Sequence, residues 1–324
     1  MHKKLFLIPL LILSTGCTNS GNTSSLSTSE STSTTSSSYT HNLKIAAPVG
    51  APAIAFYDYA EDENFETNSD ASNIAKMMVN KSVDVAVLPT NAGIKAIVGK
   101  KLDYKIAATI SFGNLYIAST GNDNDETMDE NDYIVLFQQG SVPDLVFHSI
   151  YGSSLDKGIH YVGKESLAAQ CLSAGKDLTS ENETVDYVLI AEPAFSTVKA
   201  AKSNVQEYAN MQTLYREKFS YEIFQASIFV KNDADKSSVD LFLSSLESDI
   251  SSGLVNPTLI KEGISKAKEP KSIFGADPET AMNVTKNGNR MGLGFKLAKD
   301  NKAAIDKFLS IFEINETSEE IYYK

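Results

Sequence analysis

From residue 42 onward, short apolar runs alternate with segments whose apolar residues recur at helical spacing. The runs at 43–47, 84–88 and 105–110 are nearly continuous, which is typical of parallel strands covered on both faces. Segments such as 71–79 lie between them and have helical periodicity. This alternation predicts an α/β fold with crossover helices.

The pattern restarts after an acidic segment at 122–132. Strands are expected at 115–119, 133–137, 159–162, 186–191 and 226–230, and helices after 143, over 165–178 and after 193. From residue 236 onward the pattern is helical throughout. Two successive α/β units and a helical tail predict two lobes, each a mixed, mostly parallel sheet with flanking helices, and a tail that packs back on the first lobe.

Residues 1–16 predict a lipoprotein signal peptide. A basic start precedes the apolar run 5–13, which is shorter than the roughly 20 residues of a membrane-spanning helix. Ser14-Thr15-Gly16-Cys17 resembles a bacterial lipobox, although Ser14 stands where Leu is usual. Cleavage would make Cys17 the lipidation site. The alternative is an ordinary signal peptide with an incidental cysteine.

The segment 17–41 is rich in Ser and Thr and almost devoid of apolar side chains. Such a segment cannot offset its own ordering entropy, so we expect a flexible tether. Together with the signal, the tether predicts a protein at the extracellular face of the cell membrane, held there by its lipid.

Charge and rare residue types narrow the possible partners. The formal net charge of −12 disfavours nucleic acid and anionic membrane surfaces. Arg216 and Arg290 are the only arginines, and their scarcity disfavours a strongly anionic ligand, although helix N-termini can bind anions. Cys17 and Cys171 are the only cysteines, so no cysteine metal site is possible, and we expect neither a metal nor a cofactor.

The loops after the predicted strands contain the candidate ligand residues, because ligands of open α/β sheets bind beyond the carboxyl ends of the strands. Glycines there let the backbone approach a ligand, and hydroxyl and amide side chains supply hydrogen bonds. Thr90, Asn91 and Ser141 have an alternative role as helix N-caps. The predicted residues are Val49, Gly50, Thr90, Asn91, Ser111, Phe112, Gly113, Gly140, Ser141 and Glu192.

Two of these residues bear on the kind of ligand. Phe112 can stack on a ring, and Glu192 can pair with a cationic or amine-bearing group; the alternative for Glu192 is a favourable charge at a helix N-terminus. A carboxylate together with few arginines favours an aromatic ligand that is neutral or partly cationic.

Four segments carry a family resemblance: 44–50, 83–91, 139–144 and 186–193. In their order and spacing, over 42–324, the chain resembles ABC-importer substrate-binding proteins of the nitrate, sulfonate and thiamine-precursor group. The resemblance implies a periplasmic-binding-protein-like type II fold with crossing segments at 115–120 and 226–231. Lobe one would comprise 42–117 and 229–324, and lobe two 118–228.

The same resemblance implies a monomer that captures a small molecule between its lobes and delivers it to an ABC permease and ATPase. The ligand would be a thiamine precursor or another small aromatic or sulfonate compound. Two other classes stay open. One is an inactive surface lipoprotein or adhesin with this fold, and the other is an enzyme, since some pyrimidine-precursor enzymes resemble the fold. His41, His148 and His160 lie in no nucleophile or zinc motif, which disfavours an enzyme.

Overall fold

A computed structural model describes residues 42–122 and 127–324, and one compact unit, Thr40–Lys324, contains them. The expected signal peptide 1–16, the tether 17–41 and the lipidation site Cys17 lie outside the described residues. Within the described ranges, no helix combines the length and the apolar character needed to cross a bilayer.

The first sheet is built from both ends of the described chain. Its strands are, in spatial order, β11 (Leu293–Leu297), β4 (Tyr104–Ser111), β10 (Ala226–Lys231), β3 (Val85–Pro89), β1 (Ile45–Pro48) and β2 (Phe65–Asn68). Strands β2, β1, β3 and β4 run in one direction, because β1 pairs in parallel with β2 and β3, and β10 runs antiparallel between β3 and β4. Strand β11 pairs antiparallel with β4.

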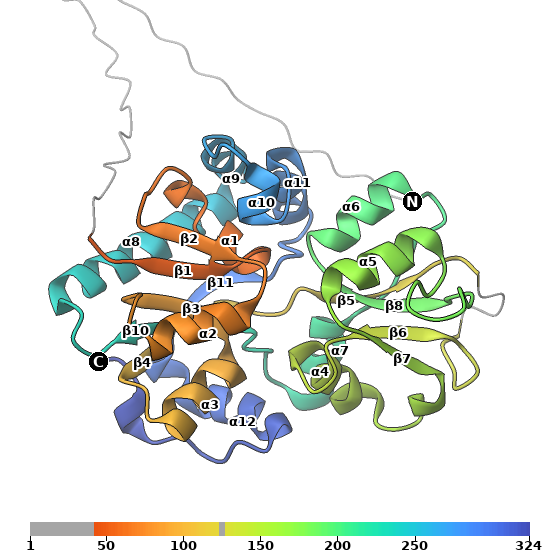
Figure 1. The fold of residues 1–324 in the computed structure, drawn as a ribbon, viewed down its shortest axis with the longest axis horizontal. Helices are drawn as coiled ribbons and strands as arrows, with labels where there is room; N and C mark the ends of the chain where they lie inside the picture. The colour runs from red at the N-terminus through yellow and green to blue at the C-terminus, as the bar shows by residue number, and fades with distance from the viewer. Residues whose placement is uncertain (1–41, 123–126) are drawn as a thin grey trace, which may run out of the picture. The chain divides into compact units, whose positions relative to one another are not determined.

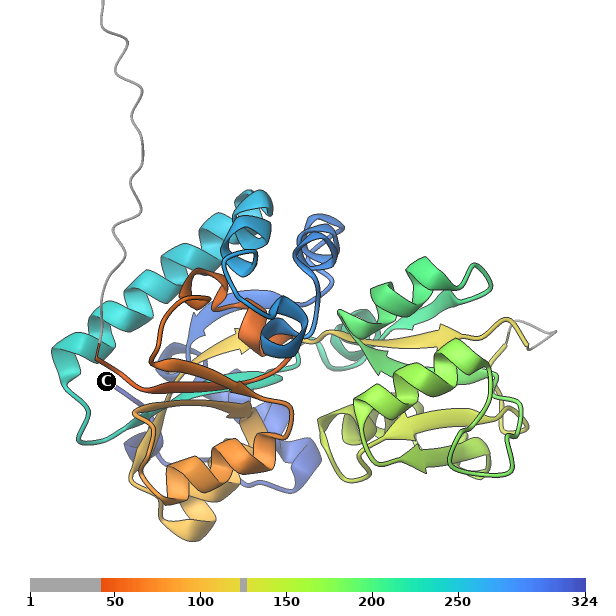
Figure 2. The ribbon, with the colours of Figure 1, turned by 45° about the horizontal axis from the view of Figure 1, so that its top comes forward.

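The second sheet is built from the middle of the chain. Its strands are, in spatial order, β7 (Ile159–Val162), β6 (Ile134–Phe137), β8 (Tyr187–Ala191), β5 (Leu115–Ser119) and β9 (Gln206–Asn210). Strand β5 runs against its neighbours β8 and β9, whereas β6 pairs in parallel with β7 and β8. Figures 1 and 2 show the two sheets as separate groups of strands. The expected α/β class and the two mixed, mostly parallel sheets are confirmed.

Helices flank both sheets, and several begin at a side-chain cap. Asp70, Asn210, Asp235 and Asp277 each accept a hydrogen bond from a backbone N–H in the first turn. The helices are α1 (Ala51–Ile54), α2 (Ala71–Val79), α3 (Thr90–Lys100), α4 (Val142–Tyr151), α5 (Glu165–Ala174), α6 (Ala194–Ala201), α7 (Met211–Phe219), α8 (Lys236–Val255), α9 (Thr258–Ile264), α10 (Pro270–Phe274), α11 (Pro278–Lys286) and α12 (Lys302–Leu309).

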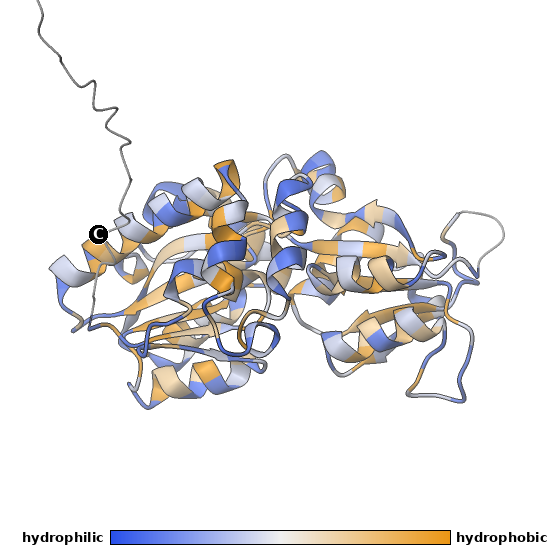
Figure 3. Ribbon diagram, turned by 90° about the horizontal axis from the view of Figure 1, so that it is seen from above, coloured by the Kyte–Doolittle hydropathy of each residue, from blue (hydrophilic) through white to orange (hydrophobic). Residues whose placement is uncertain are grey.

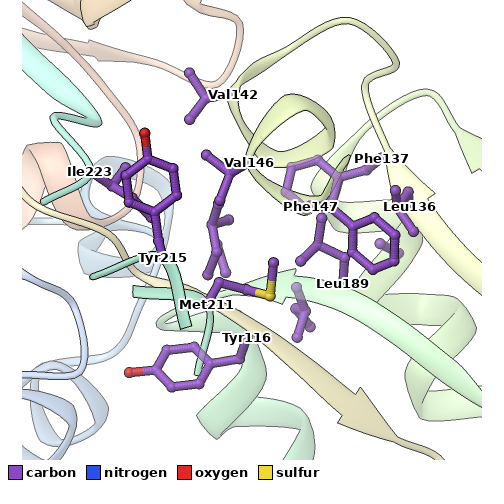
Figure 4. Close-up of a cluster of buried hydrophobic side chains, with 14 of the residues drawn as sticks. Tyr116, Leu136, Phe137, Val142, Val146, Phe147, Leu189, Met211, Tyr215 and Ile223 are labelled. Carbon is purple, nitrogen blue, oxygen red and sulfur yellow. The ribbon is translucent and has the colours of Figure 1, made fainter. Parts of the chain in front are cut away.

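The buried apolar residues form two clusters separated by the first sheet. One cluster lies between that sheet and helices α8–α11, and includes Phe56 and Phe242. The other begins under α2 and α3 on the opposite face and continues into the second lobe. Its second-lobe part, with Phe147 and Tyr215, is drawn in Figure 4. Figure 3 shows strands that are largely hydrophobic and helices that carry both hydrophobic and hydrophilic segments. Continuity of this cluster couples the packing of the two lobes.

Three strands depart from the sequence-based expectation. Strands β2, β9 and β11 were not expected, and β11 interrupts the tail that we expected to be helical from 236 onward. All three are edge strands, and much of their surface is exposed or half-buried. An edge strand needs no continuous apolar run, so the pattern that reveals central strands misses it. The tail nevertheless returns to the first sheet, through β11.

The chain changes sheets twice. It leaves the first sheet after Ser111 and enters the second at Leu115, and it returns between Asn210 and Ala226 through α7. Strands β5 and β10 each belong wholly to one sheet, whereas the expected lobe limits at 117 and 229 fall inside them. We propose that the lobe limits lie in the connections 112–114 and 220–225.

Candidate functional site

The loop after β1 contains a glycine in a conformation that side chains resist. Gly50 has φ +106°, and a Cβ placed on it would meet no heavy atom within 4 Å. Backbone strain, and not lack of space, therefore favours glycine at this position. Val49 precedes it, and its N–H donates to the Asn68 carbonyl at the end of β2.

Two adjacent residues after β3 have different environments. Thr90 is fully buried, and its hydroxyl lies 2.8 Å from that of Ser227, which lies 2.8 Å from that of Thr109. Asn91 is 7% exposed, and its Oδ1 has no hydrogen-bond partner among the described residues. Neither side chain caps α3. The Thr90 hydroxyl is thus used internally, whereas the Asn91 amide oxygen is left for a ligand or water.

The end of β4 presents a second orphaned group. Ser111 is fully buried, and its Oγ has no partner within the described ranges. Phe112 packs edge-to-face on Phe224, with ring centroids 5.6 Å apart, and the Lys296 ammonium lies 5.1 Å from the Phe112 ring centroid. Phe112 is 9% exposed, so its ring is mainly a packing element in this conformation.

Gly113 lies where the chain passes between the sheets. Its φ is +99°, and a Cβ would come within 2.4 Å of Oε1 of Gln212. Any larger residue would therefore be strained and would displace the Gln212 side chain on α7. The next residue, Asn114, donates from Nδ2 to the Glu192 carbonyl, and its Oδ1 accepts from Nε2 of Gln225. Both chain crossings and the end of β8 thus share one hydrogen-bond network.

In the second sheet, the loop after β6 is held by an acid. Gly140 has φ +76°, and its N–H donates to Oδ2 of Asp144 at 2.7 Å. Oδ1 of Asp144 accepts from the Tyr161 hydroxyl at 2.8 Å. Ser141 begins α4 without capping it, and its buried Oγ is another atom without a partner in the described chain.

Glu192, after β8, is already paired. Its side chain is fully buried, and its carboxylate accepts from Nε of Arg290 at 2.7 Å and from the hydroxyl and N–H of Ser196. Arg290 also donates to Glu207 at 2.6 Å and lies 4.1 Å from the Tyr116 ring centroid. In this conformation the Arg290 guanidinium already pairs with Glu192, and contact of Glu192 with a cationic ligand stays a prediction. Its alternative role at the N-terminus of α6 is the one observed.

The structure adds a carboxylate that the sequence-based reasoning missed. Glu165 begins α5, directly after β7, and forms no hydrogen bond or ion pair with a described residue. Part of its surface is exposed, yet burial of the carboxyl, and secondarily the charge of Glu192, raise its pKa to about 7. An available sequence signal was its place after a strand end, which is the criterion that selected Ser141 and Glu192.

Orphaned polar atoms concentrate at the predicted site. Among the described residues, four buried side-chain atoms lack a partner: Asn91 Oδ1, Ser111 Oγ, Ser141 Oγ and the Tyr215 hydroxyl in the second-lobe core. Three of the four belong to predicted ligand residues. Each unpaired buried polar group costs about 1–3 kcal/mol, so such groups are rare unless something binds them. At the three predicted positions, the unpaired atoms are available to a ligand or to water.

The predicted residues form two sets. Thr90 and Ser111 flank the start of β10, since the Thr90 N–H donates to the Gln225 carbonyl and the Gln225 N–H donates to the Ser111 carbonyl. In the second set, Gly140, Ser141 and Glu192 follow β6 and β8. The Asn114 amide joins the sets, while no hydrogen bond between described residues joins Gly50 or Asn91 to Gly140 or Ser141.

Two surface hollows and two histidines lie elsewhere in the described chain. Surface hollows of about 520 and 630 Å³ are lined by residues of 303–316 and 254–289, none of them a predicted ligand residue. No group of three His, Cys, Asp or Glu residues in 42–122 and 127–324 is arranged to hold a metal ion. His160 stacks on Tyr133, and His148 contacts Asp144 and Asp156.

Comparison with known proteins gives structural likeness at low sequence identity. No protein-family model matches the chain, and no curated protein matches it. An ABC transporter structure from Parabacteroides distasonis has a TM-score of 0.67 and 18% identity, over 84% of this chain and 91% of that one. The zinc-bound ligand-binding component of an ABC-type import system from Staphylococcus aureus has a TM-score of 0.63 and 10% identity, over 87% and 96%.

The periplasmic aliphatic sulphonate binding protein SsuA from Escherichia coli is also similar, with a TM-score of 0.60 and 10% identity over 83% of this chain and 87% of that one. The structural likeness covers 87–96% of these three proteins. The chain therefore has the two-lobed α/β fold of periplasmic substrate-binding proteins.

Proposed function

We propose that the protein is an extracytoplasmic solute-binding protein that captures a small molecule at its strand ends and delivers it to an ABC permease and ATPase. The observation that carries this proposal is the concentration of orphaned buried atoms at Asn91, Ser111 and Ser141. The fold shared with the ligand-binding component of an ABC-type import system supports it.

The proposed ligand is a small aromatic compound such as a thiamine precursor, with a sulfonate as the less favoured class. Anion clamps usually rely on free arginines. Here Arg290 is paired with Glu192 and Glu207, and Arg216 lies exposed on α7. Polar groups of a neutral or cationic ligand match the orphaned oxygen atoms, which accept hydrogen bonds at Asn91 and accept or donate them at the two serines.

Thermal unfolding of the purified protein against a panel tests ligand binding. The panel holds thiamine and its pyrimidine precursor, riboflavin, taurine, alkanesulfonates, nitrate and amino acids. A ligand at about 100 times its Kd should add about 2.7 kcal/mol to the free energy of unfolding. A hit that Asn91→Ala weakens supports the proposal. Absence of any hit, and of any small molecule released on denaturation, contradicts it and favours an adhesin.

We further propose that the mature chain begins at a lipidated Cys17 and is anchored at the outer face of the cell membrane. The small residues before Cys17 and the Ser/Thr-rich segment 17–41 support this proposal. Cys17→Ala should abolish labelling by a fatty-acid analogue and release the protein to the medium. Labelling that persists in this variant would contradict lipidation at Cys17.

A non-catalytic role follows from the proposed transport function. Pyrimidine-precursor enzymes are the enzyme class that stays open. Incubation of the protein with each compound that binds, followed by mass spectrometry of the compound, tests for turnover. Unchanged ligand after many hours supports transport, whereas stoichiometric or catalytic conversion would overturn it.

A further inference from the structure

The second sheet places an unpaired carboxylate among its strand ends. Phe137 of β6 pairs with Val162 of β7 at the carboxyl ends of these parallel strands, and the Gln138 N–H donates to the Val162 carbonyl. Ser141 follows the first strand and Glu165 follows the second. The orphaned Ser141 hydroxyl and the unpaired Glu165 carboxylate thus lie beyond neighbouring strand ends.

The elements packed against α5 supply no cation to this carboxylate. Those elements are β6, β7, β8 and α6. On these elements lie His160, stacked on Tyr133, Tyr161, which donates to Asp144, and Lys199, whose ammonium lies 5.8 Å from the Phe195 ring centroid. Glu192, between β8 and α6, is paired with Arg290. Lys164, the residue immediately before α5, is exposed and forms no ion pair with Glu165.

Position and exposure distinguish Glu165 from the acids beside it. Asp144 is committed to the Gly140 N–H and the Tyr161 hydroxyl, and Glu192 to Arg290 and Ser196. Glu165 has neither a hydrogen-bond donor nor an ion-pair partner within the described chain, although the surrounding protein partly removes its carboxyl from water. A desolvated carboxylate is stabilised by a cation that arrives with a ligand.

We propose that Glu165 binds the cationic or protonated-amine group of the transported solute. This inference rests on the proposed function and makes that function specific: the solute bears a positive charge near the ends of β6 and β7. The neutral acceptors and hydroxyls at Asn91, Ser111 and Ser141 then bind its uncharged polar groups. A monoanionic sulfonate or nitrate at the same place would be repelled by Glu165.

The inference predicts a proton linkage with a definite sign. Without ligand, burial raises the pKa of Glu165 to about 7, so the carboxyl is mostly protonated at pH 5.5 and mostly ionised at pH 8. A permanent cation binds the ionised form and displaces the proton. Affinity should rise between these pH values by up to about 30-fold, the ratio of the ionised fractions.

The experiment is titration calorimetry of the purified protein at pH 5.5 and pH 8, in buffers with different ionisation enthalpies. The probes are thiamine, choline and putrescine as cations, propanesulfonate and nitrate as anions, and riboflavin as a compound without a cationic group. The variants are Glu165→Gln and, as a matched control for net charge, Glu217→Gln on the exposed face of α7. Circular dichroism verifies that both variants are folded.

The inference predicts that a cation binds the wild type more tightly at pH 8, with proton release. Glu165→Gln should lower that affinity by about 10- to 100-fold at pH 8 and abolish the proton release. Glu217→Gln should change neither. Loss of affinity without loss of the proton release would mean a structural role and overturn the inference.

Two other results separate this inference from the proposed function. If an anion or the neutral probe binds and Glu165→Gln leaves its affinity unchanged or improves it, the protein is a solute-binding protein and the role of Glu165 is overturned. If Lys164→Gln then weakens binding of the anion, Lys164 is the protein cation that pairs with it. If no probe binds and no small molecule is released on denaturation, the proposed function fails, and the inference fails with it.

Discussion

The strand ends of the two sheets differ in chemistry. The first sheet presents neutral groups, namely the orphaned oxygens of Asn91 and Ser111, above a buried chain of hydroxyls from Thr90, Ser227 and Thr109. The second sheet presents acids at the ends of β7 and β8. Glu192 is neutralised by Arg290, and Glu165 is not. On the proposed function, the first lobe would recognise the hydrogen-bonding pattern of the solute, and the second would recognise its charge.

The largest effect should come from the core that joins the lobes. Phe147 is fully buried in the continuous cluster, so Phe147→Ala should lower the free energy of unfolding by about 3–5 kcal/mol. Because the cluster runs into the first lobe, urea unfolding should keep a single transition. Leu241→Ala on the exposed face of α8 is the control and should have little effect. Two separate transitions in the wild type would contradict coupling between the lobes.

The next effect concerns the neutralised acid. Arg290→Ala leaves the Glu192 carboxylate buried without its guanidinium, which typically costs 3–5 kcal/mol. Because Arg290 retains some exposure, we expect about 3 kcal/mol, measured by urea unfolding. The double variant Arg290→Ala, Glu192→Gln should recover part of this loss. Equal losses in the single and double variants would show that the guanidinium stabilises through its contact with Tyr116 instead.

Adjacent residues of the first lobe separate binding from stability. Asn91→Ala should weaken the binding of a panel ligand by about tenfold, the value of one hydrogen bond, and leave the free energy of unfolding unchanged or raised. Thr90→Val should lower the free energy of unfolding and leave the affinity for the ligand unchanged, because the Thr90 hydroxyl is bonded to Ser227. Calorimetry gives the affinities, and urea unfolding gives the stabilities. If Asn91→Ala lowers the free energy of unfolding as much as Thr90→Val does, Asn91 has a structural role and the proposed difference between the two residues is wrong.

The smallest effect is a pH dependence of ligand-free stability, because both carboxyls concerned keep some exposure and solvent screens them. Burial, and secondarily Asp58, raise the pKa of Asp249 in the first lobe to about 6, and the pKa of Glu165 in the second is raised to about 7. A raised carboxyl pKa means that the folded state binds the proton more tightly, so its contribution to stability is lost as pH rises from the unfolded pKa to the folded one. The windows are pH 3.8 to about 6 for Asp249 and 4.5 to about 7 for Glu165.

One substitution of each acid should abolish the loss of stability over the corresponding pH range. Relative to the wild type, Asp249→Asn should gain stability as pH rises through the lower window, and Glu165→Gln as it rises through the upper one. Melting temperatures measured from pH 4 to pH 8 check this difference. The same pH profile for the wild type and Glu165→Gln would show that the Glu165 carboxyl is not desolvated in the folded protein.

The central strands were predictable, whereas of the four edge strands only β7 was. The runs that became β1, β3, β4 and β8 are apolar because both faces of those strands are covered, so burial is visible in the sequence. Strand β9 reads Gln-Glu-Tyr-Ala-Asn and is mostly exposed, so only its pairing with β5 defines it. The loops with candidate ligand residues followed from the central strands, because a ligand site beyond a parallel sheet is fixed by where its strands end.

The sequence by itself determined the α/β alternation, the two lobes and the strand-end loops, because local apolar periodicity reflects which faces are buried. Tertiary structure alone decided which polar groups at those loops are free. Arg290 is 98 residues from Glu192 in the chain and neutralises it, and Ser227, 137 residues from Thr90, engages its hydroxyl. Pairing of this kind depends on distances between atoms of remote segments. For that reason Glu165, an ordinary helix-starting residue in the sequence, emerges in the fold as an acid at a strand end with no ion pair among the described residues.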